Sequence, residues 1–237
     1  MLPVVCLPGL LSTASVYDRV LAGTDAPGES QVLVLPALDD FDAIAASITN
    51  DLPPRCLLVG HSMGAYLCLE LWRRAPGRIA GMALLSCTAA ADSPAVSEGR
   101  QKAVRYARKA GIAALAEAVA KQTMSPAAYQ DQGLRAQMLA MAEVIGVETF
   151  AVHQTALAGR PDSTATLPGI TCPVLVVAGS LDAVTPPQAG QALAASIPRG
   201  VFHEIAGAGH MLPLEAPEAL AALLHPFLSD CTNEALT

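Results

Sequence analysis

The sequence has few charged residues, few aromatic residues and no long uninterrupted apolar run. Charged side chains make up 15% of the 237 residues and aromatic ones 4%. The net charge is −7 at pH 7, and the densest basic stretch, residues 100–109, has the spacing of a solvated helix face. A polyanion partner requires clustered Lys and Arg, so nucleic-acid binding is disfavoured. Because no apolar run approaches the roughly 20 residues of a membrane span, we expect no membrane partner either.

The six cysteines contain no C-x-x-C pair and stand far apart. Four of them lie in or beside apolar strand-like runs, where a free cysteine behaves as a small buried hydrophobe. We therefore expect free thiols, no metal site and a reducing, cytoplasmic location. The apolar N-terminus lacks the basic start of a signal peptide and contains Pro3 and Pro8. We interpret it as a core strand.

Short apolar runs alternate with helical patterns along most of the chain. Continuous apolar runs are typical of parallel strands covered on both faces. Strands are expected at Leu2–Leu7, Gln31–Leu35, Cys56–Gly60, Ile79–Leu85, Val174–Ala178 and Val201–Ile205. Helices are expected at about Ser15–Leu21, Phe41–Asn50, Ser62–Arg74, Pro187–Ile197 and Ala216–Leu228. This repetition predicts an α/β fold with a doubly wound, six-stranded, mainly parallel sheet.

One long interval, residues 88–168, contains an Ala-rich helical pattern and no convincing strand. It is too long for a single crossover, so we expect several helices inserted after the fourth strand as a lid over the active edge of the sheet. The predicted organisation is a core of residues 1–87 and 169–237 with a helical lid at 88–168, in one structural domain overall. The polar tail Asp230–Thr237 is expected to fray.

The segment GHSMG, from Gly60 to Gly64, joins a strand-like run directly to an amphipathic helical pattern. A strand that turns into a helix within one or two residues strains the corner residue and brings neighbouring backbone close. The positions two before and two after the corner must then be small, as these glycines are. Ser62 is therefore expected to stand above the sheet as a nucleophile, while His61 points away and packs. A glycine turn with an incidental serine is the alternative interpretation.

A serine nucleophile needs a base, and the base needs an orienting acid. Among the five histidines, His210 lies in a glycine-rich loop directly after the last strand, which brings it to the edge where Ser62 also lies. Asp182 follows the fifth strand and is the expected acid, with Asp92 as its rival. Thr185 is expected to cap the next helix. The predicted catalytic residues are therefore Ser62, Asp182 and His210.

Two backbone N–H groups are candidates for an oxyanion hole. That of Met63 is one of the unpaired first-turn donors of the helix after Ser62. That of Leu10 belongs to the loop after the first strand, where Gly9 lets the backbone approach a substrate. An apolar pocket is expected between the sheet edge and the lid. Its candidate lining residues, for which helical packing is an equal alternative, are Leu11, Met124, Met138, Met141 and Met211.

Together these segments resemble the α/β-hydrolase superfamily, and specifically its small lidded esterases and enol-lactonases. The resemblance covers nearly the whole chain and rests on PGLL, GHSMG, RIAGMALLSC, TCPVLVVAGSLDAVTPP and GAGHMLPLEAPE. It implies the strand order 2-1-3-4-5-6 and the chain order nucleophile, acid, histidine. Members usually carry His-Gly after the first strand and begin with an antiparallel hairpin. This chain has Pro8-Gly9 there and starts almost on the first central strand.

These residues predict a serine hydrolase that cleaves a small carboxylic ester or lactone through an acyl-enzyme, without a metal or organic cofactor. A carbon–carbon bond hydrolase or a perhydrolase with the same triad stays open as an alternative. So does a ligand-binding receptor of the same fold that turns over negligibly. The expected partner is a small-molecule ester or lactone, and the protein is expected to be a monomer or homodimer.

Overall fold

The computed structural model describes residues 2–24 and 30–236 and contains a six-stranded parallel sheet. The strand order is β2-β1-β3-β4-β5-β6, which confirms the predicted order and fold class. All pairs of neighbouring strands are parallel. The bounds are β1 Val4–Leu7, β2 Ser30–Val32, β3 Cys56–His61, β4 Ile79–Leu85, β5 Val174–Gly179 and β6 Gly200–Ile205. The order reverses between β1 and β3, so the loops after these two strands flank one crevice.

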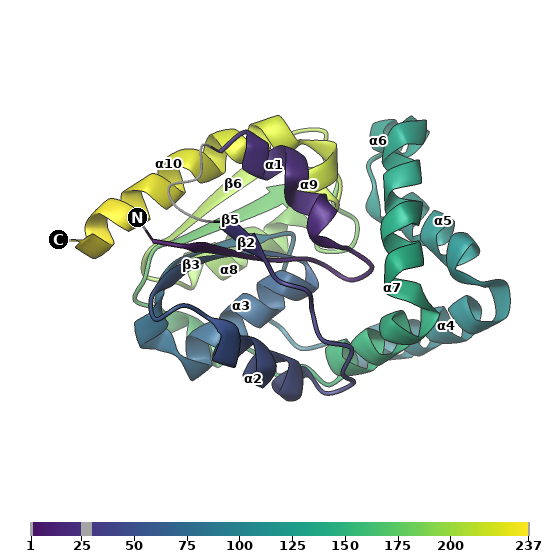
Figure 1. Ribbon diagram of the computed structural model, residues 1–237, viewed down its shortest axis with the longest axis horizontal. Coiled ribbons are helices and arrows are strands. Elements are labelled where there is room, and N and C mark those ends of the chain that lie inside the picture. Colours follow the sequence, from purple (N-terminus) through teal and green to yellow (C-terminus); the bar gives the residue numbers. More distant parts are fainter. Residues whose placement is uncertain (1, 25–29, 237) are drawn as a thin grey trace.

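Helices cover both faces of the sheet, which explains the continuous apolar runs of its central strands (Figure 1). Val5 of β1 packs into a core with α2 (Phe41–Asp51), α3 (Met63–Arg74) and α8 (Pro187–Ala195). Val4 points to the opposite face of the sheet and packs into a second core with the helices that cover that face. These are η1 (Ala14–Tyr17), α1 (Asp18–Ala22), α9 (Leu212–Glu215) and α10 (Pro217–Leu236).

The interval between β4 and β5 forms a bundle of helices, as expected from its sequence. Its elements are α4 (Pro94–Ala110), α5 (Ile112–Thr123), α6 (Pro126–Gln130) and α7 (Gln132–Ala158), and we call residues 94–158 the insertion. Gly146, with φ of 74°, breaks α7 into two helical segments. Figure 1 shows the insertion standing beyond the carboxyl ends of the strands. Short 3-10 helices precede β4 and β5, at η2 (Pro76–Arg78) and η3 (Thr164–Gly169).

The prediction of a frayed tail at 230–237 is wrong for its described part, because α10 continues to Leu236. Cys231 lies buried against Gly81 of β4, whose added Cβ would be 2.7 Å from the cysteine sulfur. Arg199 pairs with Glu234 at 2.6 Å, which ties the exposed side of the same turn to the sheet. Burial of one small apolar side chain thus holds a segment that is otherwise polar. Thr237 lies outside the described residues.

The sequence predicts free cysteines and no membrane-spanning segment, and the described residues bear on both predictions. All six cysteines are buried and free. Burial raises the pKa of the Cys6 thiol to about 12, which keeps this side chain neutral in the core. Over residues 2–24 and 30–236, no helix combines the length and the apolar character needed to cross a membrane.

The turn from β3 into α3 brings backbone segments into direct contact. A Cβ on Gly64 would lie 2.0 Å from the carbonyl oxygen of Leu7, and one on Gly60 would lie 2.4 Å from the carbonyl oxygen of Gly64. Ser62, at the corner, has φ of 51° and ψ of −113°, which is a strained conformation for a residue with a side chain. Glycine is therefore a steric requirement at both flanking positions.

Replacing Gly64 with alanine should destabilise the fold by about 3 kcal/mol or more, because the added methyl group meets backbone atoms that cannot move aside. Gly99→Ala is the matched control, since nothing lies within 4 Å of its added Cβ in α4. Alanine there should raise stability by about 0.5–1 kcal/mol. Urea unfolding of both variants tests this pair, and a Gly64→Ala midpoint equal to that of the wild type would contradict it.

Candidate active site

The side chains of Ser62, His210 and Asp182 meet at the carboxyl edge of the sheet, as the sequence predicts. Ser62 lies at the corner between β3 and α3, Asp182 follows β5, and His210 follows β6. The Nε2 of His210 is 2.9 Å from the Oγ of Ser62. Its Nδ1 is 2.8 Å from the Oδ2 of Asp182. A hydroxyl, an imidazole and a carboxylate therefore form one continuous chain of hydrogen bonds.

The carboxylate of Asp182 is buried and saturated with donors. Its Oδ1 accepts from the backbone N–H groups of Val184 and Thr185, each at 2.8 Å, and its Oδ2 accepts from the Thr185 hydroxyl at 2.8 Å. Burial on its own raises the pKa of Asp182. The hydrogen bond and charge of His210, followed by the bonds from Thr185, outweigh it and leave the pKa below 3.8. Asp182 is thus held as an anion facing the imidazole.

Thr185 and Asp92 have partners that their sequence positions did not suggest. Thr185 does not cap α8, whose N-cap is Pro186 without a side-chain bond. Its hydroxyl binds Asp182 instead, and lies 3.3 Å from the Nδ1 of His210. Asp92, the rival acid, pairs with Arg100 and Arg160. Its carboxylate is therefore already engaged by two guanidinium groups, away from the imidazole.

His61 packs, as expected, but it also binds the loop that carries His210. Its Nε2 lies 2.8 Å from the carbonyl oxygen of His210, and the two rings have centroids 5.3 Å apart. Burial, and then the neighbouring charge of His210, lower the pKa of His61 to about 3. The ring is therefore neutral, and its Nε2–H is the donor to the carbonyl. Among the described residues its Nδ1 has no hydrogen-bond partner, and a Cβ on Gly9 would lie 2.8 Å from it.

The two predicted oxyanion donors lie on neighbouring loops. Met63 is the first residue of α3, where backbone N–H groups have no partner within the helix. Leu10 lies in the turn after β1, which is closed by a 3.2 Å bond from the Ser12 N–H to the Gly9 carbonyl. β1 and β3 are paired, with Leu7 opposite Gly60, so both loops leave the sheet side by side. Leu11, in the same turn, has φ of 57°.

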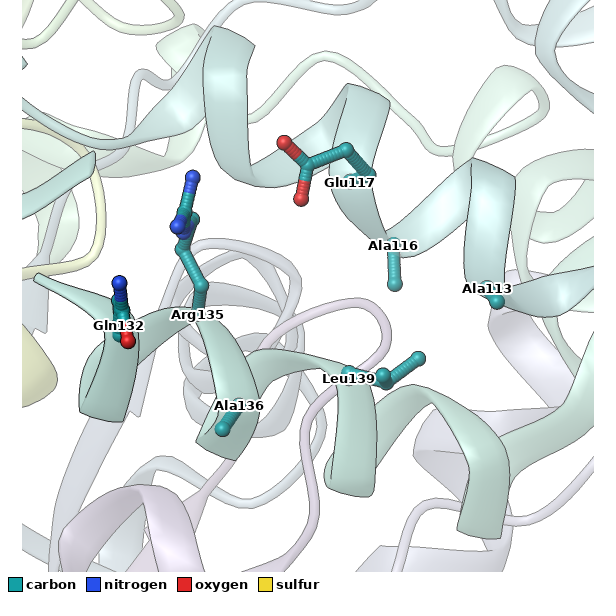
Figure 2. A pocket seen from close by; sticks show the side chains of 7 residues that line it. All are labelled: Ala113, Ala116, Glu117, Gln132, Arg135, Ala136 and Leu139. Atoms are coloured by element: carbon teal, nitrogen blue, oxygen red, sulfur yellow. The ribbon is translucent and has the colours of Figure 1, made fainter. Parts of the chain in front are cut away.

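The five predicted pocket residues are all buried in apolar clusters. Leu11 packs with residues of α4, α5 and α7, while the four methionines share the core that contains α9 and α10. A hollow of about 350 Å³ lies elsewhere in the insertion, between α5 and α7. Figure 2 shows Glu117 and Arg135 on opposite sides of it, and none of the five predicted residues lines it. Over residues 2–24 and 30–236, no three His, Cys, Asp or Glu side chains gather as metal ligands would.

Proteins of known activity resemble this chain over most of its length. The bifunctional biotin biosynthesis protein BioHC of Cellvibrio japonicus is 27% identical over 86% of the chain, which spans only 41% of that protein. The structure of a thermophilic esterase from Thermogutta terrifontis is 29% identical, with a TM-score of 0.85, over 98% of this chain and 90% of the esterase. The enol-lactonase of Burkholderia xenovorans LB400 shares the fold, at 22% identity and a TM-score of 0.86, over 97% and 92% of the two chains.

A family model extends this likeness across the whole site. The model described as the alpha/beta hydrolase family matches residues 4–223. That range begins at β1 and includes the corner at Ser62, the complete insertion and the loops of Asp182 and His210. The resemblance inferred from separate sequence motifs is thereby confirmed. The chain belongs to the alpha/beta hydrolase family.

Proposed function

We propose that this protein is a serine hydrolase that cleaves a small carboxylic ester or lactone through an acyl-enzyme. The observation that carries the proposal is the hydrogen-bonded chain from Ser62 through His210 to Asp182, with distances of 2.9 and 2.8 Å. Both distances suit proton transfer without any movement of the side chains. The likeness to an esterase at 29% identity supports an ester bond as the target.

The proposed reaction begins when the Oγ of Ser62 attacks the substrate carbonyl while the Nε2 of His210 takes its proton. Asp182 holds the Nδ1–H of the imidazole and stabilises its cationic form. His210 then returns the proton to the leaving oxygen, and an acyl-enzyme remains on Ser62. Water repeats the sequence with His210 as base, so the acid is released and Ser62 is restored. In a lactone the leaving oxygen stays attached to the acyl chain as a hydroxyl group throughout, so the second step releases a single hydroxy acid.

The proposed oxyanion hole consists of the backbone N–H groups of Leu10 and Met63. Two neighbouring loops carry these donors, and Met63 directly follows the strained corner at Ser62. Loss of one such donor typically costs roughly 3–4 kcal/mol of transition-state stabilisation. The substrate is proposed to lie between the sheet edge and the insertion. Its apolar neighbours would be Leu11, Met124, Met138, Met141 and Met211.

His61 supports the same arrangement in its neutral form. Its bond to the His210 carbonyl fixes the backbone from which the catalytic imidazole extends. Because burial lowers the pKa of His61 to about 3, the folded protein excludes a proton that the unfolded chain binds below about pH 6.5. Folding therefore becomes less favourable as the pH falls from about 6.5, the ordinary pKa of histidine, towards about 3, the pKa of His61 in the folded protein. At pH values above this range the contribution of His61 to stability is complete.

A panel of p-nitrophenyl esters and small lactones tests the proposed reaction. We expect hydrolysis with a preference for short acyl groups, and a loss of at least about a thousandfold in kcat/KM for Ser62→Ala with an unchanged melting temperature. Removing the hydroxyl leaves only binding and oxyanion stabilisation. Rapid turnover that does not depend on Ser62 would contradict the proposal. Ligand binding with no hydrolysis of any compound would favour a receptor function. Acyl transfer that depends on added peroxide would favour a perhydrolase.

The pH dependence of stability tests the state of His61. Between about pH 6 and 4, the free energy of unfolding of the wild type should fall more steeply than that of His61→Gln, by roughly 1.4 kcal/mol per pH unit. The glutamine keeps a donor for the His210 carbonyl but binds no proton when unfolded. His203→Gln, which removes an exposed histidine of β6, is the control and should keep the wild-type slope. Parallel curves for wild type and His61→Gln would show that His61 is charged in the folded protein.

A further inference from the structure

The loop that carries His210 touches the insertion through backbone atoms alone at one point. The N–H of His210 donates to the carbonyl of Thr123, the last residue of α5, at 2.7 Å. A Cβ on the preceding residue, Gly209, would lie 2.5 Å from the backbone nitrogen of Ser125 and 2.8 Å from the Thr123 carbonyl oxygen. The junction between α5 and α6 and the His210 loop therefore lie as close as two backbones can.

A single carboxylate bridges this contact. The Oε2 of Glu215, the last residue of α9, accepts the N–H of Ser125 from the insertion and the N–H of Gly209 from the loop, each at 2.9 Å. Its Oε1 accepts the N–H of Met211 at 2.9 Å. Hydrogen bonds to an ionised acceptor are roughly twice as strong as those between neutral groups. Glu215 thus holds the residues on both sides of His210 and attaches them to the insertion.

The backbone of His210 is consequently held from two directions. Its N–H binds the insertion through Thr123, and its carbonyl binds the end of β3 through the Nε2 of His61. The imidazole has two partners of its own, Asp182 and Ser62. A shift of the insertion therefore moves the peptide from which the imidazole extends. Such a movement changes the contacts of the imidazole, including the 2.9 Å contact with Ser62.

We propose that Glu215 is a positioning residue that couples the insertion to His210, so that the imidazole meets Ser62 only while the α5–α6 junction is in place. This inference rests on the proposed function of Ser62 and His210. Glu215 binds three backbone N–H groups and touches neither the serine nor the aspartate through any of these bonds. Its effect on the reaction is therefore transmitted entirely through the loop. The proposal makes the insertion part of the catalytic geometry, in addition to any role as a cover for the substrate.

Hydrogen exchange of the backbone amides tests the coupling itself, without reference to activity. In Glu215→Ala, protection should fall both at residues 207–212 and at residues 124–125, because one carboxylate serves both segments. Glu218→Ala is the matched control, since Glu218 follows three residues later and forms an exposed ion pair with Arg19. This variant should exchange like the wild type. Loss of protection confined to 207–212 would overturn the proposal, because Glu215 would then order only its own loop.

Kinetics with p-nitrophenyl acetate test the consequence for the reaction. Glu215→Ala should lower kcat by roughly 10- to 100-fold with KM nearly unchanged, as expected for a misplaced base rather than a lost substrate contact. Glu215→Gln keeps the side-chain volume and one acceptor oxygen, so its kcat should lie between those of Glu215→Ala and the wild type. It also serves as the test variant if the alanine protein does not fold. A wild-type kcat in a folded Glu215 variant would contradict the positioning role.

The exchange and kinetic experiments distinguish a failure of the coupling proposed for Glu215 from a failure of the proposed hydrolysis. If the wild type cleaves no ester or lactone, the function assigned to Ser62 fails, yet the exchange experiment still reports whether Glu215 joins the insertion to the loop. If the wild type is active and Ser62→Ala is not, but Glu215→Ala keeps its kcat, the hydrolase stands and the coupling is refuted. Joint loss of protection together with a fall in kcat supports both.

Discussion

The contact between the imidazole of His210 and the hydroxyl of Ser62 is the interaction on which the rest of the site depends. Three segments far apart in the chain must converge to make and support it. A parallel sheet provides that convergence, because the loops after β3, β5 and β6 all leave from one edge. The strained corner at Ser62 and the glycines beside it then bring the serine to that edge. The close approach of backbone segments therefore places Ser62, the proposed nucleophile, at this edge.

Much of this arrangement could be predicted from the sequence because its signals are local. β4 begins and ends at the predicted residues, Ile79 and Leu85, since a strand buried on both faces is a continuous apolar run. β2 is shorter than predicted and ends at Val32. It is an edge strand, and Val34, which the apolar pattern would include, is 82% exposed. Hydropathy alone does not distinguish a paired residue from an exposed one at such an edge.

The remaining features depend on contacts between distant segments, which no local pattern encodes. Thr185 looks like a helix cap but donates to Asp182, and His61 looks like packing but binds the His210 carbonyl. Glu215 has no local signal for its role, because the donors that surround it come from the His210 loop and from the insertion. The insertion accordingly contributes to the site through its backbone contacts. Its backbone is one of the supports of the loop that bears the proposed base.

The most direct measurement of the central claim is covalent labelling with a fluorophosphonate, followed by intact-mass and peptide mass spectrometry. A serine activated by His210 should take up one adduct, located in the peptide that contains Ser62. Labelling should slow by roughly a thousandfold in His210→Ala, because the hydroxyl then has no base. An adduct on a different serine, or equal labelling rates for the wild type and His210→Ala, would contradict the account.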